Sequence, residues 1–279
     1  MYSYQHGYHA GGLADVVKHT LLGLVLQRMA AKAGQVQYFE THAGRGVYPL
    51  AMREMNKTAE YVHGLQKVWP FRAKAPAALV PWLEAVGALN PKGDVTRYPG
   101  SPAVAAALLR EGDALHLCEG HPQEFAALED ALGADARVHV YKTDGPRRVP
   151  TLLPSTGTRT VVLIDPSYEV KTEYAATVNT VKAILKRNPK AVVLVWYPLL
   201  PDARHTPLVE GLAALKISAT YKAELTWAAP SDRGAYGTGQ VILNLPYQLE
   251  TDMAQALNWL LPVLSHDGSV EMGFVHPPA

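Results

Sequence analysis

Apolar residues recur at intervals of three and four near the start of the chain. Over residues 13–32 they include Val16, Leu21 and Val25, which is the period of an α-helix, and Gly34 supplies a stop signal. A short run of β-forming residues follows at 36–39. The pattern therefore predicts a helix over 13–32 and then a short strand that leads into a glycine-rich turn.

Further short apolar runs alternate with helical stretches along the rest of the chain. They lie at 114–118, 138–141, 161–164 and 191–196. Alternating strands and helices predict a parallel sheet, and uninterrupted apolar runs such as 161–164 suit strands buried on both faces. We therefore expect an α/β fold with a mostly parallel sheet.

Two regions depart from this alternation. Near the end, the runs 217–227 and 240–245 flank a segment rich in proline and glycine, which predicts an antiparallel strand pair followed by a last helix at 250–264. Between the first glycine turn and the strand at 114, the chain is longer than one crossover requires. Helical patterns at 59–69 and 77–89 predict a small inserted subdomain over 50–95, with the main domain formed by 1–49 and 96–279.

Composition limits the classes of protein that remain. The chain has 279 residues, with 26 Lys and Arg against 25 Asp and Glu, so a histone-like polycation is excluded. Its one cysteine, Cys118, cannot form an internal disulfide and fits a reducing compartment. The longest apolar stretch, 191–200, is about half of the ~20 residues that a bilayer span needs, and no secretion signal is visible. We expect a cytoplasmic protein with no membrane span.

A glycine turn after the first strand is the first candidate for ligand binding. Glu40 ends that strand, and Gly44 and Gly46 would let the backbone approach a ligand closely. The third glycine of the dinucleotide fingerprint is missing because position 49 is Pro, which disfavours a nicotinamide cofactor. Taken alone, such a turn is equally a plain connection from strand to helix.

Two more acids follow later strands in the same way. Glu119 could accept hydrogen bonds from ribose hydroxyls, and Asp144 precedes Gly145. Each could also be a helix N-terminal acid stabilised by the helix dipole. Acids at successive carboxyl ends of parallel strands mark the crevice in which open α/β sheets bind ligands.

The segment after the strand at 161–164 is Asp165-Pro166-Ser167-Tyr168, which resembles the Asp-Pro-Pro-Tyr motif of adenine-N6 methyltransferases. The exocyclic amine of adenine is a poor nucleophile because its lone pair is delocalised into the ring. A carboxylate and the carbonyl of Pro166 could accept its two N–H bonds and aim the lone pair at a methyl donor. We therefore predict that Asp165 is catalytic and that Tyr168 stacks on a flipped-out base. Asp-Pro alone is also a common turn signal, and Ser167 replaces the second proline.

The chain as a whole resembles the bacterial ribosomal large-subunit methyltransferase J family, whose members methylate N6 of one adenosine in 23S ribosomal RNA. The resemblance begins in the N-terminal segment 1–20 and continues, in order, to the end of the chain. The matching motifs are Thr41-His42-Ala43-Gly44, Tyr98-Pro99-Gly100-Ser101-Pro102, Glu119 with His121-Pro122, Asp144-Gly145, Asp165-Pro166, Trp196-Tyr197-Pro198 and Ser231-Asp232-Arg233.

The resemblance implies roles for individual residues. The contacts to S-adenosylmethionine would come from His19, His42, Ser101, Glu119, Asp144, Gly145 and Asp165. Tyr4 would contact the substrate RNA together with Pro166 and Tyr168, and Lys18 is a weaker candidate. The family's fold is a Rossmann-like class I methyltransferase with a small helical insertion, which agrees with the insertion expected at 50–95.

Some alternatives stay open. The histidines near the N-terminus show no metal-binding spacing on a clear helix face, so no metal is expected. RNA binding normally shows as a basic patch, and here only loop residues such as Arg45, Arg148 and Lys171 could form one. The alternatives are an adenine-N6 methyltransferase that acts on DNA and a catalytically silent RNA- or nucleotide-binding protein. The oligomeric state is left open, with a monomer favoured.

Overall fold

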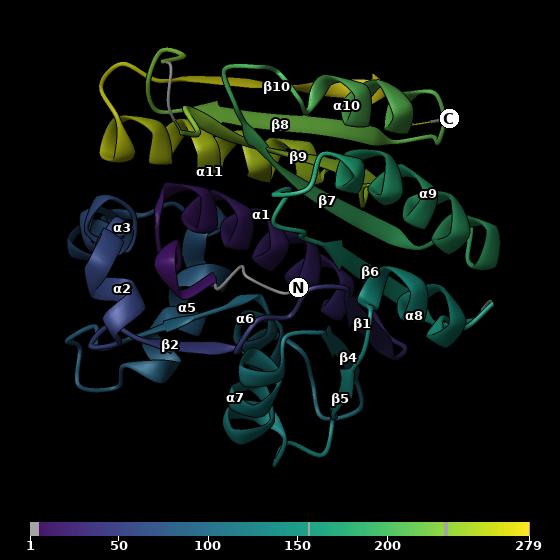
Figure 1. Ribbon diagram of the computed structural model, residues 1–279, viewed down its shortest axis with the longest axis horizontal. Helices are drawn as coiled ribbons and strands as arrows, with labels where there is room; N and C mark the ends of the chain where they lie inside the picture. Colours follow the sequence, from purple (N-terminus) through teal and green to yellow (C-terminus); the bar gives the residue numbers. More distant parts are fainter. Residues whose placement is uncertain (1–5, 156, 232–233, 279) are drawn as a thin grey trace.

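The computed structural model describes residues 6–155, 157–231 and 234–278, and it shows a large sheet with helices on both faces (Figure 1). Five neighbouring strands of this sheet run parallel. In spatial order they are β5 (Val138–Lys142), β4 (Ala114–Glu119), β1 (Val36–Glu40), β6 (Arg159–Ile164) and β7 (Val192–Leu199). The predicted α/β architecture is thus confirmed.

Beyond β7 the sheet continues with antiparallel strands. They are β9 (Gly237–Leu243), β8 (Thr220–Thr226) and, at the edge, β10 (Ser269–His276). The predicted antiparallel pair is present as β8 and β9, but the sequence analysis did not predict β10. This strand alternates exposed and half-buried positions, so it lacks the continuous apolar run that marks the central strands.

Helices cover the two faces of the sheet and form a separate apolar core on each side. One face carries α1 (Leu13–Ala30), α5 (Val80–Leu89), α6 (Ser101–Leu108), α7 (Pro122–Leu132) and α11 (Leu249–Leu264). The other carries α8 (Gly145–Leu152), α9 (Thr172–Arg187) and α10 (Thr206–Ala213). None of the helices in the described part of the chain combines the length and the apolar composition that crossing a bilayer requires.

Helix α1 is buried on almost all sides, because it lies between the sheet and the helices α5, α6 and α11. It ends at Ala30, two residues before the predicted end. Three of its polar residues, Asp15, Lys18 and His19, are nearly inaccessible to solvent. A helix that is enclosed in this way can hold charged side chains only where partners are available, and these partners form part of the site described below.

The insertion predicted at 50–95 is made of short elements. They are α2 (Arg53–Thr58), α3 (Glu60–His63), α4 (Leu65–Val68), the 3-10 helices η2 (Trp69–Lys74) and η3 (Ala77–Leu79), and α5. The helix expected at 59–69 is interrupted at Gly64, where a Cβ atom would lie 2.3 Å from the carbonyl oxygen of Gly11. Trp82 and Val86 share the core that contains α1, and the division into two domains stays a prediction.

A small hairpin-like sheet closes the insertion. Strand β2 (Val47–Pro49) pairs antiparallel with β3 (Arg97–Pro99), so the chain leaves and re-enters the main fold at neighbouring points. Near the start of the chain, a 3-10 helix η1 (His6–Tyr8) precedes α1. Both the small sheet and η1 lie near the carboxyl end of β1 and contribute residues to the pocket there.

Candidate active site

The pocket with the predicted site residues lies at the carboxyl ends of the parallel strands. Strand β1 lies between β4 and β6, so the crossovers on its two sides run in opposite directions and leave a crevice there. The cavity has a volume of about 340 Å³, which is in the range of small-molecule sites. Its walls include the segments that follow β1, β4, β5 and β6, as the positions of the acids predicted.

Strand register explains why two of the acids meet in this cavity. Glu40, the last residue of β1, is paired in register with Leu117 of β4 and with Leu163 of β6. Glu119 and Asp165 each follow two positions later. These two carboxylates therefore lie just beyond the end of β1, on either side of the glycine turn, and both line the cavity.

Two glycines bring backbone close to the cavity. Gly44 has a positive φ of 60°, and a Cβ atom there would lie 2.4 Å from the hydroxyl of Tyr48. A Cβ atom at Gly145 would lie 1.9 Å from the carbonyl oxygen of Thr41. A side chain at Gly145 would collide with backbone, and one at Gly44 would strain the backbone and displace the Tyr48 hydroxyl. The turn after β1 and the start of α8 thus pack against each other through their backbones.

Backbone donors hold Glu119. The amide N–H of Gly44 donates to Oε2 at 2.8 Å, and the amide N–H of His121 donates to Oε1 at 2.7 Å. Burial raises the pKa of Glu119, an effect that these N–H donors partly offset. Each carboxylate oxygen keeps a second lone pair, so the group can still accept hydrogen bonds from a pair of ligand hydroxyls.

Asp144 lies at the edge of the cavity, directly before α8. Its exposed carboxylate forms an ion pair with Arg147 at 3.3 Å. Asp144 and Gly145 both line the cavity, as expected from the sequence. An exposed acid at this edge can accept a hydrogen bond from a ligand amino group.

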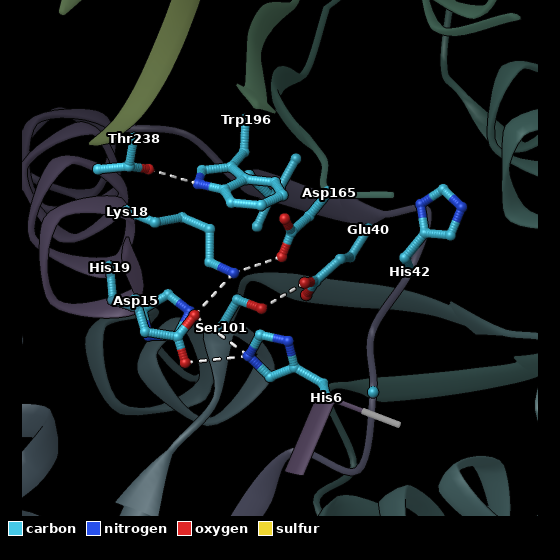
Figure 2. Close-up of polar contacts among 12 residues, drawn as sticks. His6, Asp15, Lys18, His19, Glu40, His42, Ser101, Asp165, Trp196 and Thr238 are labelled. Atoms are coloured by element: carbon cyan, nitrogen blue, oxygen red, sulfur yellow. Dashed lines mark hydrogen bonds and ion pairs between the residues drawn. The ribbon is translucent and has the colours of Figure 1, made fainter. Parts of the chain in front are cut away.

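Asp165 belongs to a buried chain of ion pairs (Figure 2). The Nζ atom of Lys18 lies 2.5 Å from Oδ2 of Asp165 and 2.9 Å from Oδ1 of Asp15. Asp15 in turn bonds to Nε2 of His6 at 3.0 Å and accepts the amide N–H of Gly11. The side chains of Lys18 and Asp15 are each 2% exposed, so solvent screens these pairs very little.

The charges in this network stabilise one another. Burial alone would lower the pKa of Lys18, but the carboxylates of Asp15 and Asp165 outweigh it and raise that pKa above its usual value. Burial would likewise raise the pKa of Asp15, but the charges of His6 and Lys18 bring it well below its usual range. The indole of Trp196 lies 5.2 Å from the Lys18 ammonium and donates to Thr238.

Glu40 lies beneath this network and has different partners. The hydroxyl of Ser101 donates to its Oε1 atom, and the hydroxyl of Tyr38 donates to Oε2 at 2.9 Å. Burial raises the pKa of Glu40 to about 8, although both hydroxyl donors favour the charged form. At neutral pH this carboxyl group is therefore mostly protonated.

Both histidines expected at the cofactor line the cavity. The Nδ1 atom of His19 is hydrogen-bonded to the hydroxyl of Tyr98 at 2.8 Å, and Nδ1 of His42 to the hydroxyl of Thr41 at 2.8 Å. Burial lowers the pKa of His19 to about 3 and that of His42 to about 4. Both imidazoles are therefore neutral at pH 7.

The loop after β6 differs in one respect from the prediction. Asp165, Pro166 and Ser167 line the cavity, but Tyr168 does not. Tyr168 has a positive φ of 54°, is only 3% exposed, and donates from its hydroxyl to the carbonyl oxygen of Trp196 at 2.8 Å. Its ring packs at 4.3 Å on Tyr174. Its ring has no free face on which a base could stack in this structure. The prediction that Tyr168 stacks on the flipped-out base is therefore wrong.

Other candidates have different outcomes. Tyr4 lies outside the described residues, as do Asp232 and Arg233. Arg45, expected on a basic rim, bonds to both carboxylate oxygens of the buried Glu124. Among the described residues, no three His, Cys, Asp or Glu side chains are grouped as metal ligands.

Three features of the site were not predicted from the sequence, namely the roles of Asp15 and His6 and the position of Glu40 beneath the pocket. A signal for the first was available, because Asp15 and Lys18 are charged residues three positions apart within an otherwise apolar helix. A helix buried on all sides can accommodate such a pair only if the charges meet. That pattern could have raised Lys18 from a weaker candidate to a central one.

The groups present suit S-adenosylmethionine. Glu119 can accept bonds from two ribose hydroxyls, and Asp144 can accept one from an amino group. The acids that line the cavity, together with neutral His19 and His42, favour a ligand that carries a positive charge.

Comparisons with known proteins agree with this arrangement. A family model described as "Ribosomal RNA large subunit methyltransferase D, RlmJ" matches residues 34–275. The Escherichia coli protein "Ribosomal RNA large subunit methyltransferase J" is 36% identical over 261 residues, which cover 93% of each chain. The protein of the same name from Haemophilus influenzae is 35% identical over 271 residues, which cover 96% of each chain.

A solved structure has the same fold. The crystal structure of a protein from Legionella pneumophila superposes with a TM-score of 0.89 at 31% sequence identity. The match covers 95% of this chain and 98% of the other. The insertion and the antiparallel edge thus lie within a fold that is shared over nearly the whole length of both proteins.

Proposed function

Because the chain belongs to the ribosomal RNA large subunit methyltransferase family RlmJ, we propose that it transfers a methyl group from S-adenosylmethionine to N6 of a specific adenosine in 23S ribosomal RNA. The observation that supports the chemistry is the position of Asp165. Its carboxylate, held by Lys18, lines the same cavity as Glu119, so an amine and a methyl donor could meet there.

The residues of this chain would hold the donor from several sides. Glu119 would bind the ribose, and Asp144 would bind the adenine amino group. The backbone of the glycine turn would lie against the donor molecule. When bound, S-adenosylmethionine supplies an electrophilic methyl group on a positively charged sulfur. His19 and His42 are neutral at pH 7, so they add no positive charge that would repel it.

Asp165 and Pro166 would prepare the attacking amine. Lys18 fixes Oδ2 of Asp165, which leaves Oδ1 to accept one N–H of the adenine amine, and the carbonyl oxygen of Pro166 accepts the other. The nitrogen lone pair is then directed at the methyl group. As the new C–N bond forms and the S–C bond breaks, the nitrogen loses one proton, which Asp165 is placed to receive.

The target base must leave its stack to reach this position, because a stacked and paired amine is inaccessible. Tyr168 is buried, so we assign the base contact to the Pro166 segment and to the N-terminal segment that contains Tyr4. The role of Tyr4 rests on the resemblance and stays a proposal.

A methyl-transfer assay tests the proposal. Purified protein with a donor that carries a labelled methyl group is incubated with unmodified 23S ribosomal RNA, with fragments of it, and with duplex DNA. We expect label in RNA as N6-methyladenosine and none in DNA. Label in DNA alone would refute the substrate, and no transfer to any adenine would refute the reaction. Mass mapping of ribosomal RNA from cells that lack the gene would identify the adenosine.

A variant tests the role of Asp165. We expect Asp165→Asn to lower kcat by about 10²- to 10⁴-fold, because an amide is a poor proton acceptor. Asp130→Asn, the same change at an exposed position on α7, is the matched control and should keep full activity. Donor binding measured by calorimetry should stay within about tenfold for both. Full activity of Asp165→Asn would exclude the catalytic role.

A further inference from the structure

A second cavity lies on the other side of helix α9 from the active site. It is a groove of about 490 Å³ between α9 and α10. These two helices pack against each other (Figure 1). Gly211 allows this close packing, because a Cβ atom there would lie 2.9 Å from a methyl group of Val178. The groove is part of the packed structure and not a gap between mobile loops.

The groove carries an excess of positive charge. Lys171, Lys182 and Arg204 line it, together with the amide side chain of Asn179. Arg204 donates from Nε to Asp202, which neutralises part of its charge. Lys171 and Lys182 form no ion pair with any described residue. No carboxylate lines the groove within the described part of the chain, so an anion there would meet cations and an amide.

One polar atom in the groove lacks a partner. The hydroxyl of Tyr174 is buried and has no hydrogen bond among the described residues, and the residue as a whole is 5% exposed. A buried hydroxyl without a partner destabilises the folded state. Burial raises the pKa of Tyr174. The charge of Arg204 offsets part of this rise, whereas Asp202 and Glu173 add to it. A ligand oxygen between the side chains of Tyr174 and Arg204 would satisfy the hydroxyl.

Helix α9 lies between the groove and the active site and contributes residues to both. Glu173 and Thr177 of this helix line the active-site cavity, whereas Lys171 and Tyr174 line the groove. The ring of Tyr174 packs on Tyr168, the last residue of the Asp165–Tyr168 segment. An RNA strand that extends beyond the nucleotide at Asp165 could reach the groove on the other side of this helix.

We propose that this groove binds a backbone phosphate of the substrate RNA, outside the nucleotide whose base enters the active site. This inference rests on the proposed function, because it takes the substrate to be RNA. Lys171, Lys182 and Arg204 supply the charge that binds the phosphate, and the Tyr174 hydroxyl donates to one of its oxygens. Such contacts position the strand without reading its sequence.

RNA binding by charge-reversal variants tests the proposal. The probe is a fluorescently labelled fragment of 23S ribosomal RNA, and its affinity is measured by anisotropy at several salt concentrations. We expect Lys182→Glu and Lys171→Glu each to weaken binding by about tenfold and to reduce the slope of log K against log salt by about 1. Lys190→Glu, the same change in the exposed turn that precedes β7, should stay within about twofold. Equal affinity and slope for Lys182→Glu and Lys190→Glu would overturn the proposal.

Kinetics separate positioning from chemistry. For Lys182→Glu we expect KM for RNA to rise while kcat at saturating RNA changes less than about twofold, since the contact lies outside the reacting atoms. A fall in kcat at unchanged KM would contradict the binding role. If the wild-type protein transfers no methyl group to RNA, the proposed function fails, but the anisotropy measurement still tests the groove independently.

Removing the Tyr174 hydroxyl tests the site more finely. Tyr174→Phe keeps the ring and its packing on Tyr168 but deletes the donor. We expect RNA binding to weaken by about three- to tenfold while the melting temperature stays the same or rises, because a buried unsatisfied group is lost. Unchanged RNA affinity would overturn the assignment of this hydroxyl to the phosphate.

Discussion

Two buried carboxyl groups beneath the active site have opposite ionisation behaviour. Asp15, on α1, is 2% exposed and has a pKa well below its usual range. Glu40, at the end of β1, is fully buried and has a pKa raised to about 8. Both lie close to Lys18 and Asp165 (Figure 2). Their surroundings differ in the partners that each carboxylate meets.

The partners explain the difference. Asp15 contacts two groups that carry or can carry positive charge, His6 and Lys18, whereas Glu40 contacts the hydroxyls of Ser101 and Tyr38. A hydroxyl donor stabilises a carboxylate less than a cation does, so it does not overcome the cost of burial. In addition, the charge of Asp165 raises the pKa of Glu40. Burial alone therefore does not decide whether an acid is charged.

The largest effect is expected from removing the cation on the Asp15 side. Lys18→Met leaves Asp15 and Asp165 buried without their shared ammonium group. We expect the free energy of unfolding to fall by about 3 to 5 kcal/mol, as for other broken buried pairs. Urea unfolding measures it, with the exposed Lys186→Met on α9 as a control that should change by less than about 0.5 kcal/mol. A loss below about 1 kcal/mol would show that the network is not a stabilising one.

A second experiment tests the ionisation of Glu40 by measuring stability at different pH values. Because the folded pKa of about 8 exceeds the unfolded value of 4.5, the stability that protonated Glu40 contributes is complete below pH 4.5 and is lost as the pH rises through 8. At roughly 1.4 kcal/mol per pH unit, wild type should lose about 2 to 3 kcal/mol relative to Glu40→Gln between pH 6 and pH 8. The exposed Glu84→Gln should follow wild type. Parallel curves for wild type and Glu40→Gln would contradict the raised pKa.

A third experiment examines a neutral base beside the charged network. The folded pKa of His19, about 3, lies below the unfolded value of 6.5, so the stability of the neutral form is complete above pH 6.5 and is lost as the pH falls towards 3. Between pH 7 and pH 5 this amounts to about 2 kcal/mol, which His19→Gln should abolish. His63→Gln, at an exposed position, is the control. If the loss of stability between pH 7 and pH 5 is unchanged in His19→Gln, another group causes that loss.

The smallest expected effect comes from one hydroxyl. Ser101→Ala removes a donor that lowers the pKa of Glu40, so that pKa should rise further. We expect a loss of about 1 kcal/mol in the free energy of unfolding at pH 8 and a smaller loss at pH 6, where Glu40 is protonated. Unfolding curves at the two pH values measure the difference. A loss that is larger at pH 6 would indicate that the hydroxyl does not act on the carboxylate.

Much of the fold could be predicted from local sequence patterns. The runs at 36–39, 114–118, 138–141, 161–164 and 191–196 all became parallel strands, because a buried strand needs a continuous apolar run. The acids after these strands reached the cavity, since parallel strands place their carboxyl ends at one edge. Strand β10 and the break at Gly64 were not predicted, since both depend on what other parts of the chain lie beside them.

Local patterns of residues were enough to predict the order of strands and helices along the chain and the acids at the strand ends, because apolar periodicity and turn residues act over a few neighbouring positions. Tertiary structure alone decided the partner of each polar group. Lys18 meets Asp165 across 147 positions of sequence, and Tyr168 turns away from the cavity to pack on Tyr174 and Trp196. These contacts follow from how distant elements pack, and they set which carboxylate is charged and which face of the catalytic loop is open.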